Sequence, residues 1–104
     1  MFSTGAEFEV VVAEHRRAAI LWFLHEQPSF RSNDGVLQDM LEVVGLATSR
    51  DLVRTELGWL AEQGLLAQQS IADAVVVVTL TQRGVDCARG RTIVAGVRRP
   101  DPRP

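Results

Sequence analysis

The segment SRDLVRTELGWLAEQGLL, residues 49–66, decides the fold. Its apolar side chains recur every three or four positions, which is typical of a helix with one face in a core. The inward positions are Val53, Leu57, Leu60 and Ala61, with Leu52 and Trp59 beside them. Gly64 can end this helix in a left-handed conformation, and an apolar run follows directly. The segment therefore predicts a helix and then a strand.

The start of this helix has two candidate caps. Ser49 can accept a hydrogen bond from the first turn, whereas Thr48 with Asp51 resembles a capping box. With either cap, the outward face consists of Arg50, Asp51, Arg54, Thr55, Gly58 and Glu62.

A second helix is predicted just upstream, over residues 34–44. Asn33 or Asp34 can cap it, and Gly45 can end it. The three or four residues that follow before the next helix match the spacing of a helix-turn-helix.

The first helix is predicted over residues 7–27, a stretch without glycine that ends before Pro28. Residues 18–24 are apolar on every side, and a helix that is apolar all round is buried all round. We expect a homodimer through this surface. The predicted interface residues are Ile20, Leu21, Phe23 and Leu24. The alternative is that the C-terminal helix and tail of the same chain cover it.

Downstream, two apolar runs at 65–70 and 75–80 predict a hairpin with a four-residue connection, because β-branched residues favour strands. Thr81 can cap a last helix over 82–90. With the short extended piece at 29–33, this order of elements indicates an α+β winged helix-turn-helix in residues 1–90. Residues 91–104 form a basic tail with prolines near its end, predicted to be extended.

Four segments resemble a known family: HRRAAILWFL (15–24), the opening segment, VTLTQRGVDCARGR (78–91) and GVRRP (96–100). They are similar to small winged-helix proteins of Mu-like prophages, often labelled ArsR-like, over about residues 10–100. The resemblance implies a phage-encoded protein in the cytoplasm of a bacterial host. The LTxRG feature also resembles PadR- and MarR-type regulators, which bind DNA as dimers.

The outward arginines are the candidate contacts with double-stranded DNA. Arg50 and Arg54 are one helical turn apart, so both can reach phosphates or a guanine edge, and Thr55 lies beside them. The predicted hairpin has no Lys or Arg between 65 and 80, so further phosphate contacts must come from elsewhere. The candidates for these contacts are Arg31, Arg98 and Arg99.

A competing hypothesis is a protein–protein interaction module that acts in phage development without DNA. The net charge is −2, and most of the acids lie in the body of the chain. Asp51 and Glu62 can pair with the arginines of the same helix. In the tail, Ile93, Val94 and Val97 are expected to pack on the first helix.

Other functions lack support in the sequence. His15 and His25 are ten residues apart and Cys87 is a lone thiol, so neither a metal site nor another cofactor is expected. Catalytic constellations and phosphate-binding glycine loops are missing, so no enzyme is expected. The N-terminus lacks a signal-peptide pattern. The apolar runs are shorter than the ~18 residues of a membrane span, which agrees with a cytoplasmic protein.

Overall fold

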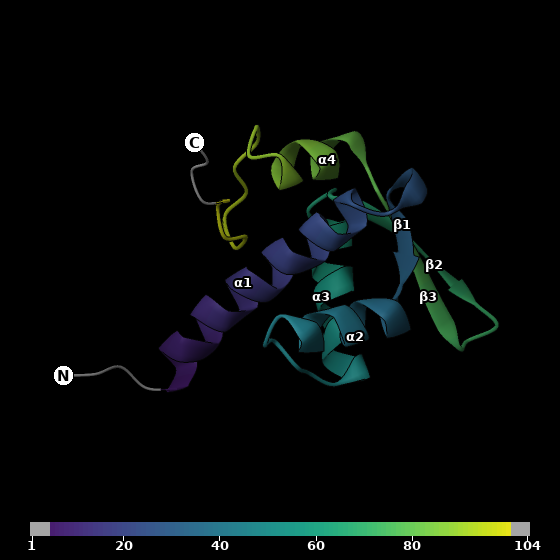
Figure 1. Ribbon diagram of the computed structural model, residues 1–104, viewed down its shortest axis with the longest axis horizontal. Helices are drawn as coiled ribbons and strands as arrows, with labels where there is room; N and C mark the ends of the chain where they lie inside the picture. The colour runs from purple at the N-terminus through teal and green to yellow at the C-terminus, as the bar shows by residue number, and fades with distance from the viewer. Residues whose placement is uncertain (1–4, 101–104) are drawn as a thin grey trace.

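The computed structural model describes residues 5–100 and shows helices packed on one side of a small sheet (Figure 1). The longer elements are α1 (Gly5–His25), α2 (Asp34–Val43), α3 (Arg50–Glu62), β2 (Leu66–Ile71), β3 (Val75–Leu80) and α4 (Gln82–Ala88). A 3-10 turn, η1 (Pro28–Phe30), and the short strand β1 (Arg31–Asn33) connect α1 to α2. The predicted α+β class and element order are confirmed. Helices α2 and α3 form the helix-turn-helix, and β2–β3 is the wing.

The sheet contains a strand that the sequence analysis described only as an extended connection. Its order is β1-β3-β2, with β3 antiparallel to both neighbours. In β1, Asn33 pairs with Val77. Three residues are too few to show the alternation that marks a strand, so β1 becomes visible only beside its partner. The wing connection is also shorter than predicted, because Ile71 already pairs with Val75.

The alternative helix caps are resolved by hydrogen bonds. The Asn33 side chain accepts from Val36 N at 2.9 Å, which makes Asn33 the cap of α2. Ser49 Oγ accepts from Leu52 N at 3.1 Å, so Ser49 caps α3. Both caps satisfy backbone donors of the first helical turn.

The core corrects the predicted dimer interface. All four apolar residues assigned to it, Ile20, Leu21, Phe23 and Leu24, are buried within one chain. They contact the inward stripe of α3 and residues from α2, β3, α4 and the tail in one cluster. Of the two alternatives for the apolar part of α1, coverage by the same chain is the one observed.

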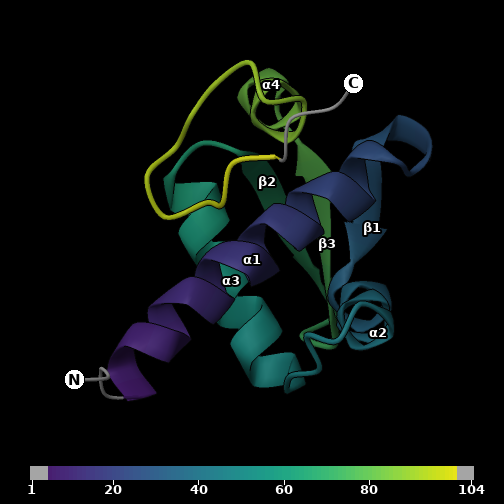
Figure 2. The same ribbon diagram turned by 60° about the vertical axis from the view of Figure 1, so that its left-hand side comes forward.

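The tail lies along α1 (Figure 2). Val94 is buried and Val97 packs against the core, as predicted, but Ile93 is 62% exposed, so its predicted docking is wrong. Arg98 N donates to Glu14 O at 3.2 Å, and Arg17 donates to Gly96 O at 3.0 Å. The predicted extended end, 101–104, lies outside the described residues.

Two of the segments that resemble prophage proteins meet at the start of α4. Thr81 Oγ1 donates to Gly64 O at 2.7 Å and accepts from Gly84 N at 3.1 Å. Arg83 Nε donates to Gln63 O at 3.0 Å. The motif LTQRG therefore has a structural role, because its hydrogen bonds hold the start of α4 against the end of α3.

Between residues 5 and 100, no helix combines the length and apolar character needed to span a membrane. In the same range, His, Cys, Asp and Glu side chains do not gather in groups of three or more that could hold a metal ion. Cys87 is buried, as expected of a packed thiol. Burial raises its pKa above 9.0, although the charge of Arg83 opposes the shift.

Candidate nucleic-acid interface

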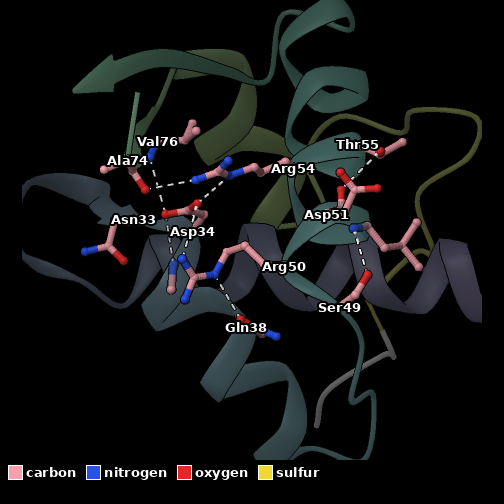
Figure 3. Close-up of polar contacts among 12 residues, drawn as sticks. Asn33, Asp34, Gln38, Ser49, Arg50, Asp51, Arg54, Thr55, Ala74 and Val76 are labelled. Carbon is pink, nitrogen blue, oxygen red and sulfur yellow. Dashed lines mark hydrogen bonds and ion pairs between the residues drawn. The ribbon is translucent and has the colours of Figure 1, made fainter. Parts of the chain in front are cut away.

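The two predicted arginine contacts on α3, Arg50 and Arg54, meet one buried carboxylate that also joins α2 to the wing (Figure 3). Arg54 Nε donates to Asp34 Oδ2 at 2.7 Å, and its Nη2 donates to Ala74 O at 2.9 Å. The other carboxylate oxygen, Asp34 Oδ1, accepts from Val76 N at 3.3 Å and from Gly35 N at 3.0 Å. Asp34 and Arg54 thus connect all three parts of the winged helix-turn-helix.

Asp34 is ionised because its surroundings compensate for burial. Its side chain is only 1% exposed, and desolvation by itself would raise its pKa. The hydrogen bonds from Arg54, Val76 and Gly35, together with the Arg54 charge, outweigh desolvation and lower the pKa below 3.8. The pair Asp34–Arg54 is therefore a permanent ion pair at neutral pH.

This pKa predicts how stability changes with acid. Because the folded-state pKa of Asp34 is lower than in the unfolded chain, its ionised form stabilises the fold above pH 3.8. That contribution is lost as the pH falls through the folded-state pKa. We expect Asp34→Asn to lower the free energy of unfolding at pH 7 by about 1–2 kcal/mol, and to lose less than wild type on further acidification. Urea denaturation between pH 7 and pH 3 measures both effects.

The matched control is Asp39→Asn, an exposed carboxylate on the same helix, α2. It removes the same charge and is expected to retain wild-type stability at pH 7. If Asp34→Asn showed the wild-type dependence on pH between 4 and 3, the role assigned to Asp34 would be wrong.

Arg50 is the more accessible of the two arginines. Its side chain is 49% exposed, yet its Nε donates to Gln38 Oε1 at 3.0 Å and its Nη1 lies 3.9 Å from Asp34 Oδ2. Gln38 is itself held by donation to Thr48 O at 3.0 Å. The guanidinium of Arg50 is therefore held in place at the start of α3, with part of its edge facing solvent.

The charge around Arg50 is mixed. One carboxylate, Asp34, neutralises one of the two arginines, and the exposed Asp51 follows Arg50 in the sequence. In the described part of the chain, the ion pairs of Arg50 and Arg54 go to Asp34, and the predicted alternative partners Asp51 and Glu62 form none. Thr55 is exposed, and its hydroxyl donates to Asp51 O at 3.2 Å.

The other predicted DNA contacts lie elsewhere. Arg31 pairs with Thr79 in β3. Thr79 is five residues after Ala74, whose carbonyl Arg54 contacts just before β3 begins. At the rise of an extended strand this separation is about 17 Å. Arg98 and Arg99 lie with Trp22 around a hollow beside α1. The structure therefore brings Arg50 and Arg54 together at Asp34, whereas Thr55 lies on the other side of α3 (Figure 3). It does not add Arg31, Arg98 or Arg99 to the two arginines.

A second buried ion cluster was missed by the sequence analysis. Glu56 on α3 accepts from Arg16 Nη1 at 2.8 Å and from Arg17 Nε at 3.0 Å. Arg17 also lies over the ring of Trp59, 4.1 Å from its centroid. Glu56 shares a helix face with Val53 and Leu60, so helical spacing alone places it inward. This cluster joins α1, α3 and the tail.

Comparisons with known proteins show relatives in phage and bacteria. The chain is 45% identical over 93 residues to uncharacterized protein gp26 of Escherichia phage Mu. This match covers 89% of the chain and 95% of gp26. It is 36% identical over 95 residues to an uncharacterized protein of Haemophilus influenzae, with 91% of each chain covered.

Among solved structures, a mutant of Lactococcus lactis ZitR in its apo form matches with a TM-score of 0.57 and 26% identity. The match covers 81% of this chain and 58% of the ZitR chain. A scan against protein-family models gives no match. The extent and identity of the phage Mu match show that the chain belongs to the family of phage Mu gp26.

Proposed function

We propose that the protein is a winged-helix DNA-binding regulator encoded by a phage, acting without catalysis in the cytoplasm of the host. The observation that carries the proposal is the Arg50 guanidinium, which is half exposed at the start of α3 and held by Gln38 and Asp34. The similarity to ZitR, a winged-helix regulator, supports the same function. A preorganised guanidinium on the second helix of a helix-turn-helix is suited to a guanine edge or a phosphate.

The two arginines have different roles in this proposal. Arg54 donates its hydrogen bonds to Asp34 and Ala74, so it positions α3 against α2 and the wing. Arg50 keeps donors facing solvent and makes the DNA contact. Removing both arginines together would confuse loss of binding with loss of fold.

The test is therefore a single substitution. We expect wild type to bind duplex DNA at low salt, where phosphate contacts are strongest, and Arg50→Ala to weaken binding about tenfold or more. Fluorescence anisotropy with a labelled duplex pool at 50 mM salt measures the affinity. Urea denaturation of Arg50→Ala is expected to show a fold within about 1 kcal/mol of wild type.

Arg31→Ala is the matched control, because it removes the same charge from an exposed arginine on another surface. It is expected to bind within about threefold of wild type. Equal affinities of Arg50→Ala and wild type would rule out the proposed contact.

A second candidate function has its own observation. The wing carries no Lys or Arg between 65 and 80, while Val43 and Val44 at the end of α2 are exposed. Both features fit a protein–protein interaction module that acts in phage development. That function predicts no binding to duplex DNA at 50 mM salt and capture of a phage-encoded protein from nuclease-treated lysate.

A further inference from the structure

The N-terminal half of α1 has no partner in the described chain that would bury its apolar side chains. It projects beyond the other elements (Figure 1), and every residue from 5 to 12 is exposed. Phe8 is 59% exposed and Val11 is 52% exposed. Such a helical segment leaves apolar surface exposed to water, which is unfavourable unless another molecule covers it.

These side chains belong to a stripe that continues along the whole outer face of α1. The stripe consists of Phe8, Val11, Val12, His15, Ala18, Ala19 and Trp22. Its spacing of three and four residues is the repeat with which helices pack against one another. It lies opposite the buried face that contains Ile20 and Leu24.

The stripe is complementary to itself when it is reversed about His15. Aromatic residues stand seven positions before and after His15, namely Phe8 and Trp22, and Trp22 is 54% exposed. Three and four positions before His15 the residues are valine, and three and four positions after it they are alanine. In an antiparallel pair centred on residue 15, large side chains would therefore face small ones.

We propose that two copies of this protein associate through antiparallel α1 helices, with the two-fold axis beside His15. Phe8 of each copy lies next to Trp22 of the other, and Val11 and Val12 lie over the alanines. Both copies use the same surface, as a two-fold interface requires. The stripe contains none of the four residues first predicted for the interface, although Leu21 and Phe23 line the hollow beside it.

A hollow on the surface provides the site against which α1 of the other copy packs. It has a volume of about 490 Å³, and Ala18, Ala19 and Trp22 belong to its lining. Val44 and Leu46 line it on the side of α2, and the tail segment 97–100 lines it on the other. The tail and the end of α2 thus form two walls along the proposed contact.

Charge supports the same orientation. Glu7 precedes Phe8 and points to the side of α1 on which the tail lies, as judged from the backbone bond between Arg98 and Glu14. When Phe8 lies beside Trp22 of the other copy, Glu7 comes next to the arginines at 98 and 99 of that copy. A parallel pair would leave Glu7 at the far end of α1 from the tail of the other copy and lose this complementarity.

The oligomeric state of the full chain tests the proposal. We expect wild type to be a dimer by light scattering coupled to size exclusion, and Phe8→Asp to raise the dissociation constant about 30-fold or more, since it removes both symmetry-related aromatic contacts with Trp22. Val43→Asp is the control, because it places the same charge on an apolar residue that is 85% exposed and off the stripe. It is expected to remain a dimer. A monomeric wild type, or a Phe8→Asp variant as dimeric as wild type, would overturn the proposal.

Disulfide trapping tests the orientation. His15→Cys is expected to form a cross-linked dimer on mild oxidation, because both thiols lie at the two-fold axis. Phe8→Cys alone is expected not to, because antiparallel packing keeps its two copies about 21 Å apart, but it should cross-link when mixed with Trp22→Cys. Wild type, whose single Cys87 is buried, gives the baseline. Equal cross-linking of His15→Cys and Phe8→Cys would show a parallel pair instead.

Both experiments are done without DNA, so they do not depend on the proposed function. Arg50→Ala is expected to remain a dimer, and Phe8→Asp keeps the α3 surface. If the protein does not bind DNA, the dimer proposal is still tested by light scattering and cross-linking. If the protein is monomeric, the DNA contact at Arg50 is still tested by fluorescence anisotropy.

Discussion

Replacing Glu56 with alanine is expected to lower the free energy of unfolding by about 3–5 kcal/mol, because it leaves two arginines without their buried carboxylate. The Glu56 and Arg16 side chains are 4% and 6% exposed, so water cannot replace the lost partner. For a domain stabilised by about 5–15 kcal/mol in total, this is a large fraction. Urea denaturation followed by circular dichroism measures the loss.

The same substitution should loosen the tail. Glu56 orients Arg17, which donates to Gly96 O and lies over Trp59. Limited proteolysis is expected to cut between 91 and 100 faster in Glu56→Ala than in wild type. Glu56→Gln keeps the shape and one acceptor oxygen, so its effect on stability should be smaller.

Glu62→Ala is the control on the same helix, because Glu62 is exposed. It should change stability by no more than about 0.5 kcal/mol. A loss below about 1 kcal/mol for Glu56→Ala would mean that the cluster contributes little beyond its packing.

The sequence predicted α3 well because most inward positions carry an apolar side chain in helical register. Glu56 was missed because its charge suggested solvent while its spacing from Val53 and Leu60 indicated the core. Helical spacing was the better guide, since two arginines of α1 compensate the buried carboxylate. Their approach is a tertiary contact across about 40 residues of sequence, which local patterns do not encode.

The candidate site shows the same limit. Outward positions on α3 correctly grouped Arg50 with Arg54, but placed Thr55 with them although it lies on the other side of α3, and Asp34 was considered only as a helix cap. Its contact with Arg54 depends on how α2 and α3 cross and on the position of the wing. The apolar run of α1 was interpreted as an interface for a similar reason, since the tail that covers it folds back from far along the chain.

Gly84 in the motif LTQRG packs closely against the backbone of Leu65. A Cβ atom at this position would overlap the carbonyl oxygen of Leu65 and approach Leu80 Cδ2 to 3.0 Å. That carbonyl accepts from Thr81 N at 3.1 Å, so it cannot move aside without breaking the junction between β3 and α4. We expect Gly84→Ala to destabilise the fold by about 3 kcal/mol or more, although alanine favours a helix over glycine by about 1 kcal/mol.

Gly58→Ala is the matched control, because it makes the same change within α3. Beyond its own stretch of helix, nothing in residues 5–100 lies within 4 Å of a Cβ atom at Gly58, in contrast to Gly84. Here the lower entropy of the unfolded chain dominates, and a gain of about 0.5–1 kcal/mol is expected. Thermal and urea denaturation of both variants should therefore shift in opposite directions. Equal shifts would mean that helix propensity decides the outcome at both positions, and that the close approach of α4 to Leu65 O relaxes at little cost.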